Sequence, residues 1–136
     1  MSISKLALVL VCLMSLPIGP LHFQEAPKEA KVTPLFSKDL ADFPGKEGLM
    51  ITVEYPPGGA DPIHRHNAYG FIYVLEGSVI MQVEGGKSVT LTAGETFYEG
   101  PDDVHLVGRN ASKTKPAKFL VFLLKGAGAP ALIPVK

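Results

Sequence analysis

The sequence predicts a single all-β domain, folded as a sandwich or a closed barrel. Short runs of apolar residues, or of alternating apolar and polar residues, recur along the last two thirds of the chain. Glycine or proline ends each of them. Almost no segment spaces its apolar residues with a helical period. The 14 glycines and 12 prolines supply the turns that many short strands need. A chain of 136 residues has room for one domain with a core of its own.

Residues 1–26 have the pattern of an export leader. Lys5 precedes an apolar run, LALVLVCLMSL, at residues 6–16. This run is shorter than the roughly 17 residues that a membrane-spanning helix needs, and its length is typical of a secretory signal peptide. We therefore expect a secreted or periplasmic protein with no stable membrane insertion after the leader is removed. An uncleaved N-terminal anchor and a buried first strand or helix of the domain are the alternatives.

The composition excludes several classes of protein. Cys12 is the one cysteine of the sequence, which excludes an intrachain disulfide, a zinc ribbon and a Cys-x-x-Cys redox motif. Thirteen basic residues balance thirteen acidic ones. Because no basic excess is available to neutralise phosphates, we expect no nucleic-acid partner.

An N-terminal arm at residues 27–47 precedes the main domain. Its charges and prolines predict an extended segment with one short strand near residues 32–36. The stretch SKDLADFPGKEG, which starts at residue 37, predicts a turn of helix that ends in a loop.

The main domain covers residues 48–125. Its first strand, LMITVEY at 49–55, alternates in polarity and is ended by PPGG. Apolar runs at 71–77 and 78–84 meet at Glu76-Gly77, which indicates a hairpin. Further strands are expected at 87–93, 95–100, 104–107 and 117–125. Residues 126–136 are expected to form a loose tail that can add a last edge strand.

Three histidines are candidate metal ligands. His64 and His66 form a His-x-His pair, and side chains two residues apart on a strand point to the same face. His105 lies about forty residues later on another strand-like stretch, and it meets the pair only if the sheet folds back on itself. Two surface histidines beside Arg65 are the alternative to a metal site. His22 lies in or beside the leader and is set aside.

Two motifs occur in order across about residues 49–124. The first consists of Gly58, His64-x-His66, Gly70 and Gly77, and the second runs from Gly94 through ETFYEGPDDV to His105, with Asn110 after it. Together they resemble the two motifs of the cupin superfamily, in its small single-domain, type-2-like form. The resemblance implies an all-β, single-domain jelly-roll β-barrel. It also implies a metal held between the two sheets by His64, His66 and His105, and a homodimer built with the arm strands.

The chain departs from the cupin pattern at three places. Gly70 stands where the family usually has a glutamate ligand, and glycine supplies no ligand. Gly100 and Asp102 stand where proline and glycine are usual, although Pro101 is adjacent. Asn110 follows His105 by five positions rather than four.

A face of three neutral imidazoles suits Fe, Mn, Ni, Cu or Zn. Such a face leaves coordination positions open, as a catalytic metal requires. The expected function is a metal-dependent enzyme, a dioxygenase or a lyase/isomerase, that acts on a small oxygen-rich molecule. The alternative is a non-catalytic cupin that binds or senses a small ligand, with or without metal. No catalytic residue is assigned.

Other residues near the motifs have structural interpretations. Strand parity turns Tyr69 away from the histidines. Glu99 is expected to be a solvated turn carboxylate; the alternative is a base, or an acceptor of a hydrogen bond from a metal-binding residue. Arg109 is expected to be an exposed loop residue, with binding of an anionic substrate as the alternative. Asp61 and Arg65 are expected to pair on the surface. The core or pocket wall is expected to consist of Met50, Met81, Phe71, Ile72, Phe97, Phe119, Val121 and Phe122.

Overall fold

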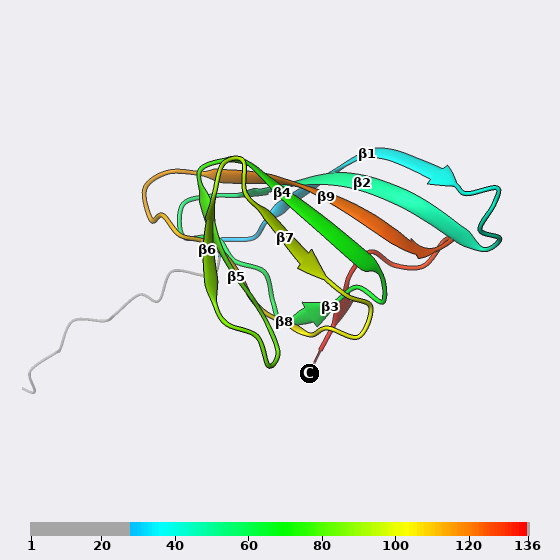
Figure 1. Cartoon of the computed structure of the whole chain (residues 1–136). Helices are drawn as coiled ribbons and strands as arrows, with labels where there is room; N and C mark the ends of the chain where they lie inside the picture. The colour runs from blue at the N-terminus through cyan, green and yellow to red at the C-terminus, as the bar shows by residue number, and fades with distance from the viewer. Residues whose placement is uncertain (1–27, 136) are drawn as a thin grey trace, which may run out of the picture.

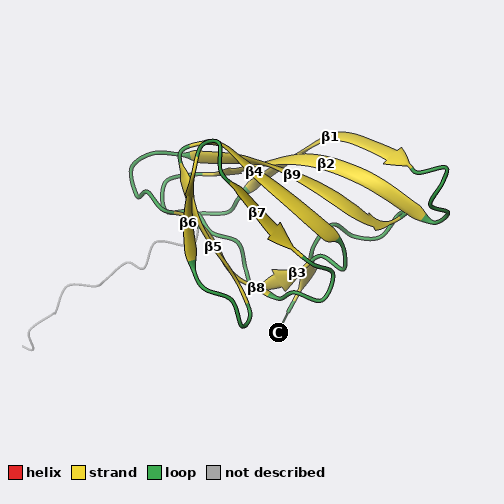
Figure 2. Cartoon of the chain, viewed as in Figure 1, coloured by secondary structure: helices red, strands yellow, loops and turns green. Residues whose placement is uncertain are grey.

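The computed structural model describes residues 28–135 as ten β-strands joined by turns, with no helix in that range (Figures 1 and 2). The predicted all-β class is confirmed. The strands are β1 (Lys31–Asp39), β2 (Lys46–Tyr55), β3 (His64–Arg65), β4 (Tyr69–Glu76), β5 (Ser78–Val83), β6 (Val89–Thr92), β7 (Thr96–Glu99), β8 (His105–Asn110), β9 (Ala117–Gly126) and β10 (Ile133–Pro134).

The strands form two antiparallel sheets of five strands each. The first sheet has the order β1-β2-β9-β4-β7 and the second the order β10-β3-β8-β5-β6. Figure 1 shows β2 and β9 running together in the first sheet, with β5, β6 and β8 in the other. The chain changes sheet at every connection except β1–β2 and β5–β6. This crossing pattern is that of a jelly-roll sandwich.

The arm is more regular than the sequence predicts. β1 extends to Asp39 and pairs with β2 along its length, from Lys31 opposite Glu54 to Asp39 opposite Glu47. The predicted turn of helix after residue 37 is therefore wrong. The pairing with β2 uses the backbone groups that a helix would need. The Leu40 amide donates to the carbonyl oxygen of Lys46 instead, which closes a short turn.

The turn between β4 and β5 depends on Gly77. A tight turn lies at Glu76-Gly77 as predicted, but the predicted hairpin is wrong, because β4 pairs with β7 and β9 whereas β5 pairs with β6 and β8 in the other sheet. Gly77 has a φ of +73°, in the left-handed region that favours glycine. A Cβ at this position would lie 2.6 Å from the carbonyl oxygen of Pro116. Backbone strain and lack of space therefore both require glycine here.

The core lies between the inner faces of the two sheets. Most of the predicted core residues point inward, and their side chains pack with other apolar residues of both sheets. Phe71, Met50 and Phe122 are exceptions. Phe71 is 49% exposed on the outer face of β4, and its cross-strand partner Phe122, which is in turn the partner of Met50, lies on the same face. The parity of β4 explains this, since Gly70, Ile72 and Val74 are the buried positions. The buried apolar residues are Ile51, Val53, Tyr55, Ala68, Ile72, Val74, Val79, Met81, Leu91, Ala117, Phe119, Val121 and Leu123.

The predicted leader, with Cys12 and His22, lies outside the described residues, so export stays a prediction. Residues 28–135 include no helix that is long and apolar enough to span a membrane.

Candidate metal centre

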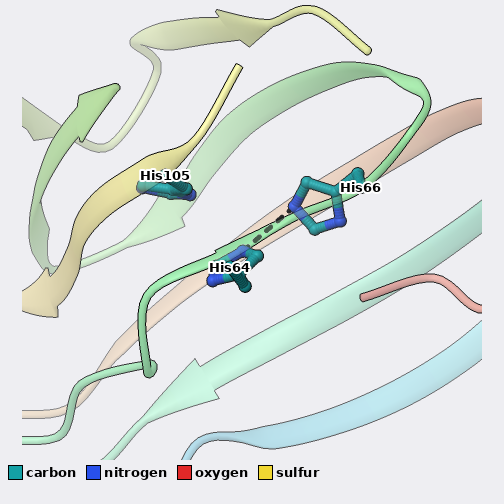
Figure 3. Close-up of side chains that lie close together, drawn as sticks. All are labelled: His64, His66 and His105. Carbon is teal, nitrogen blue, oxygen red and sulfur yellow. Dashed lines mark hydrogen bonds between the residues drawn. The ribbon is translucent and has the colours of Figure 1, made fainter. Parts of the chain in front are cut away.

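The three candidate histidines meet inside the sandwich. His64 of β3 and His105 of β8 are direct cross-strand partners, and both are buried. His66 follows the end of β3, and the chain turns at Asn67, whose φ is +48°. One ring nitrogen from each histidine lies within 4.8 Å of one from each of the others. Figure 3 shows the rings of His64 and His66 side by side, with His105 reaching toward them from β8.

Backbone carbonyls orient two of the rings. Nδ1 of His64 lies 2.8 Å from the carbonyl oxygen of Pro62, and Nδ1 of His66 lies 2.5 Å from that of Ala131. A carbonyl oxygen only accepts hydrogen bonds, so both Nδ1 atoms carry the proton. In the neutral rings the lone pairs then reside on the Nε2 atoms, which face each other at 3.1 Å. Such a pair requires a cation, either a proton or a metal ion, between the two nitrogens.

Glu99 does not occupy the position that the sequence predicts for it. It is not a solvated turn carboxylate, because it is only 3% exposed and lines the same cavity as the histidines. Its Oε1 lies 3.4 Å from Nε2 of His66, and its Oε2 lies 3.2 Å from Nδ1 of His105. The alternation of β7 carries the missed signal, since Phe97 and Glu99 occupy the inward positions while Thr96 and Tyr98 are exposed.

Three buried polar atoms of the site have no hydrogen-bond partner. They are Oε2 of Glu99 and both ring nitrogens of His105, because the contact between Glu99 and His105 is not aligned for a hydrogen bond. Buried polar atoms without partners are costly in a folded protein. Imidazole nitrogens and a carboxylate oxygen are also donor atoms that a transition metal accepts, so the residues present fit a bound metal.

The charges around the site favour a cation. Burial and the neighbouring histidines lower the pKa of His64, although the Pro62 carbonyl opposes this shift. Burial alone would lower the pKa of His66, but Glu99 and the Ala131 carbonyl outweigh it and raise this pKa. Burial alone would raise the pKa of Glu99, yet the His105 and His66 rings hold it at about 2. The carboxylate is therefore ionised and attracts positive charge to the cluster.

The site opens into a small cavity of about 80 Å³. Its polar lining residues are His64, His66, His105, Glu99 and Asp61. The rest of the lining is apolar and comes from Val32, Ile51, Val53, Met81, Phe119, Val121, Ala131 and Leu132. A cavity of this size holds a molecule of a few heavy atoms, since pockets for drug-sized ligands run from about 300 Å³ upward.

Other predicted site residues have different positions. Tyr69 is exposed and turned away from the histidines, as predicted. Arg109 is exposed on β8 and does not line the cavity. Asp61 does not pair with Arg65 on the surface. It lines the cavity and accepts a 2.5 Å hydrogen bond from the hydroxyl of the buried Tyr55.

Asn110 has a structural role in this fold. Its side-chain amide donates to the carbonyl oxygens of Pro56 and Lys115, at 3.0 and 2.8 Å, and accepts from the Ser112 amide. It therefore ties the loop after β8 to the end of β2, away from the histidine cluster.

The geometry agrees with comparison to known proteins. A family model for the cupin domain matches residues 51–123. The chain belongs to the cupin family. A search of curated proteins found no match.

Solved structures show the same cupin fold. An uncharacterized conserved protein with a double-stranded β-helix domain from Klebsiella pneumoniae has 18% identity and a TM-score of 0.62, over 79% of this chain and 86% of that one. Oxalate oxidase in complex with glycolate has 28% identity and a TM-score of 0.61, over 82% of this chain and 57% of that one. The polyketide cyclase RemF from Streptomyces resistomycificus has 25% identity and a TM-score of 0.60, over 81% and 75%. This cupin thus spans little more than half of the oxalate oxidase chain.

Proposed function

We propose that this cupin binds a divalent transition metal through His64, His66 and His105 and acts as an enzyme on a small oxygen-rich molecule. One observation carries the proposal. The Nε2 atoms of His64 and His66 face each other at 3.1 Å with their Nδ1 atoms already engaged by carbonyls, and His105 completes the cluster. A metal ion bound by all three nitrogens removes the repulsion between the lone pairs.

The donor set limits the metal to Fe, Mn, Ni, Cu or Zn. When bound, such a metal would supply a Lewis acid with positions open to a substrate, which a dioxygenase or a lyase/isomerase requires.

The protein's own residues would select the substrate. The apolar wall, which includes Ile51, Phe119 and Val121, would hold the carbon part of a small molecule and exclude water. The polar lining residues would bind the oxygen atoms of that molecule. Similarity to oxalate oxidase with bound glycolate, and to a polyketide cyclase, supports an oxygen-rich substrate.

A second candidate is a cupin that binds or senses a small ligand without turnover. The small volume and largely apolar walls of the cavity favour it. Stabilisation by a ligand in metal-free protein, with no turnover by metal-loaded protein, would select this candidate.

The arm strand also supports a homodimer. β1 is an edge strand that pairs only with β2 within the described chain, and Val32, Leu35 and Phe36 are exposed on it. A free apolar edge is prone to association, so we propose that a second copy of the chain covers it.

The test of the metal site is elemental analysis of protein purified without chelator or affinity metal. About one transition-metal ion per chain is expected in the wild type, and His105→Ala should lose it while keeping the β-sheet signal in circular dichroism. Arg65→Ala is the matched control, because Arg65 lies between the two histidines but is exposed. It should keep the metal. Wild-type protein that binds no metal, even after metal is added back, would refute the site.

A further inference from the structure

The carboxylate of Glu99 lies beside the histidine cluster, although it comes from a different strand from any of the three histidines. Its two oxygens approach His66 and His105 at 3.4 and 3.2 Å, and the His66 atom concerned is Nε2, which also faces His64. Oε2 of Glu99 has no hydrogen-bond partner, nor has either ring nitrogen of His105. The carboxylate therefore lies next to ring nitrogens of two of the three imidazoles, and one of its oxygens is free to bind a cation.

Gly70 makes room for this side chain. Gly70 of β4 is the cross-strand partner of Glu99 in β7. A Cβ built on Gly70 would lie 3.1 Å from Cγ of Glu99 and 3.7 Å from its carboxyl carbon. A longer side chain at position 70 would therefore compete with the Glu99 side chain for one space.

The charge of Glu99 has no other cation to balance it. The cavity lining contains no lysine or arginine, and the ion pairs of Glu99 within the described chain are those with His66 and His105. A buried carboxylate is costly unless it is paired or bound to a metal. Together with Asp61 it gives the cavity two carboxylates, which match the charge of a divalent ion.

We infer that Glu99 is the fourth ligand of the metal site, and that it supplies from β7 the carboxylate that Gly70 in β4 does not carry. This inference rests on the proposed metal site and deepens it. It also implies that a glutamate at either position 70 or position 99 can supply the carboxylate ligand.

The first test measures Co²⁺ affinity by competition with a chromophoric chelator, together with the visible absorption of bound Co²⁺. Glu99→Ala should bind Co²⁺ about 100-fold more weakly or worse, since even indirect partners of metal ligands contribute about 10- to 100-fold. Glu99→Gln, which keeps the shape of the side chain, should also weaken binding and alter the Co²⁺ spectrum. Glu76→Ala is the matched control, because Glu76 is exposed at the end of β4, and it should bind as the wild type does.

The second test moves the carboxylate to the facing strand. In Gly70→Glu/Glu99→Ala, alanine removes the Cγ and carboxyl atoms that a residue at position 70 would meet. This double variant should bind Co²⁺ no more than about tenfold more weakly than the wild type. Glu99→Ala alone should lose about 100-fold or more. Thermal unfolding of each variant confirms that it is folded.

If Glu99→Ala binds Co²⁺ as tightly as the wild type, the inference is overturned. The histidine site would still stand in that case if His105→Ala loses Co²⁺. A double variant that binds no better than Glu99→Ala would contradict the exchange between the two positions. If the wild type itself binds no Co²⁺, the proposed metal site fails together with the inference.

Discussion

Two backbone carbonyls decide which nitrogen each histidine of the β3 motif presents. The Pro62 carbonyl engages Nδ1 of His64 from two residues away, and the Ala131 carbonyl engages Nδ1 of His66 from 65 residues away. Such partners fix the tautomer and orientation of a metal-binding ring. Local sequence contains the first contact, but only the return of the C-terminal segment to β3 creates the second.

At the same scale, Gly77→Ala should destabilise the protein by about 3 kcal/mol, because the added Cβ meets the Pro116 carbonyl oxygen at 2.6 Å in addition to the strained φ. Gly85→Ala is the matched control. Gly85 has a φ of +75° with nothing within 4 Å of its Cβ position, so only the backbone cost of about 1 kcal/mol applies. Chemical denaturation measures both, and equal losses would contradict the steric argument.

Among the elements, the end of β9 positions the segment that reaches the histidine cluster. Lys125 is buried there and forms an ion pair with Glu47 of β2. Its ammonium also donates to the carbonyl oxygen of Ala129 at 2.6 Å. Lys125 thereby fixes the turn after β9 at Ala129. Ala131, whose carbonyl orients His66, follows two residues later.

Lys125→Met should therefore lower the midpoint of thermal unfolding by several degrees and also weaken metal binding. The first effect follows from leaving Glu47 without its partner, and the second from releasing Ala131. Lys118→Met is the matched control in the same strand. Its 3.5 Å pair with Glu54 is partly exposed, and such pairs contribute little to stability. Differential scanning calorimetry and Co²⁺ titration measure the two effects, and similar results for both variants would contradict this role of Lys125.

For the whole molecule, the open edge of β1 predicts association. Light scattering should give the mass of a dimer, and the double variant Leu35→Lys/Phe36→Lys should give a monomer, because charges on an edge strand oppose pairing. Phe36 is 58% exposed, so the change should not disturb the core. Phe71→Lys, on the outer face of β4, is the control and should remain dimeric. A dimer lost only in Phe71→Lys would place the interface on that face instead.

The fold followed from patterns that the chain carries locally. Glycine and proline end the runs, apolar residues mark β4 and β9, and Glu76-Gly77 marks a turn. These signals depend on a few neighbouring residues, which is why the all-β class was predictable. The helical turn after residue 37 was predicted wrongly because the pairing of β1 with β2 outweighs a weak local preference.

By itself, the sequence determined the all-β class, the turns that end many of the strands and the three histidines that form the cluster. Only the tertiary structure decided that Glu99 joins them, that Asp61 turns inward to Tyr55, and that Phe71 faces outward. The reason is physical. A residue's type and its neighbours limit the chemistry it can perform, whereas the partners of a buried charge come from strand register and from segments that are distant in sequence. Gly70 and Glu99 show this most directly, since they share one space only because β4 and β7 are paired in this register.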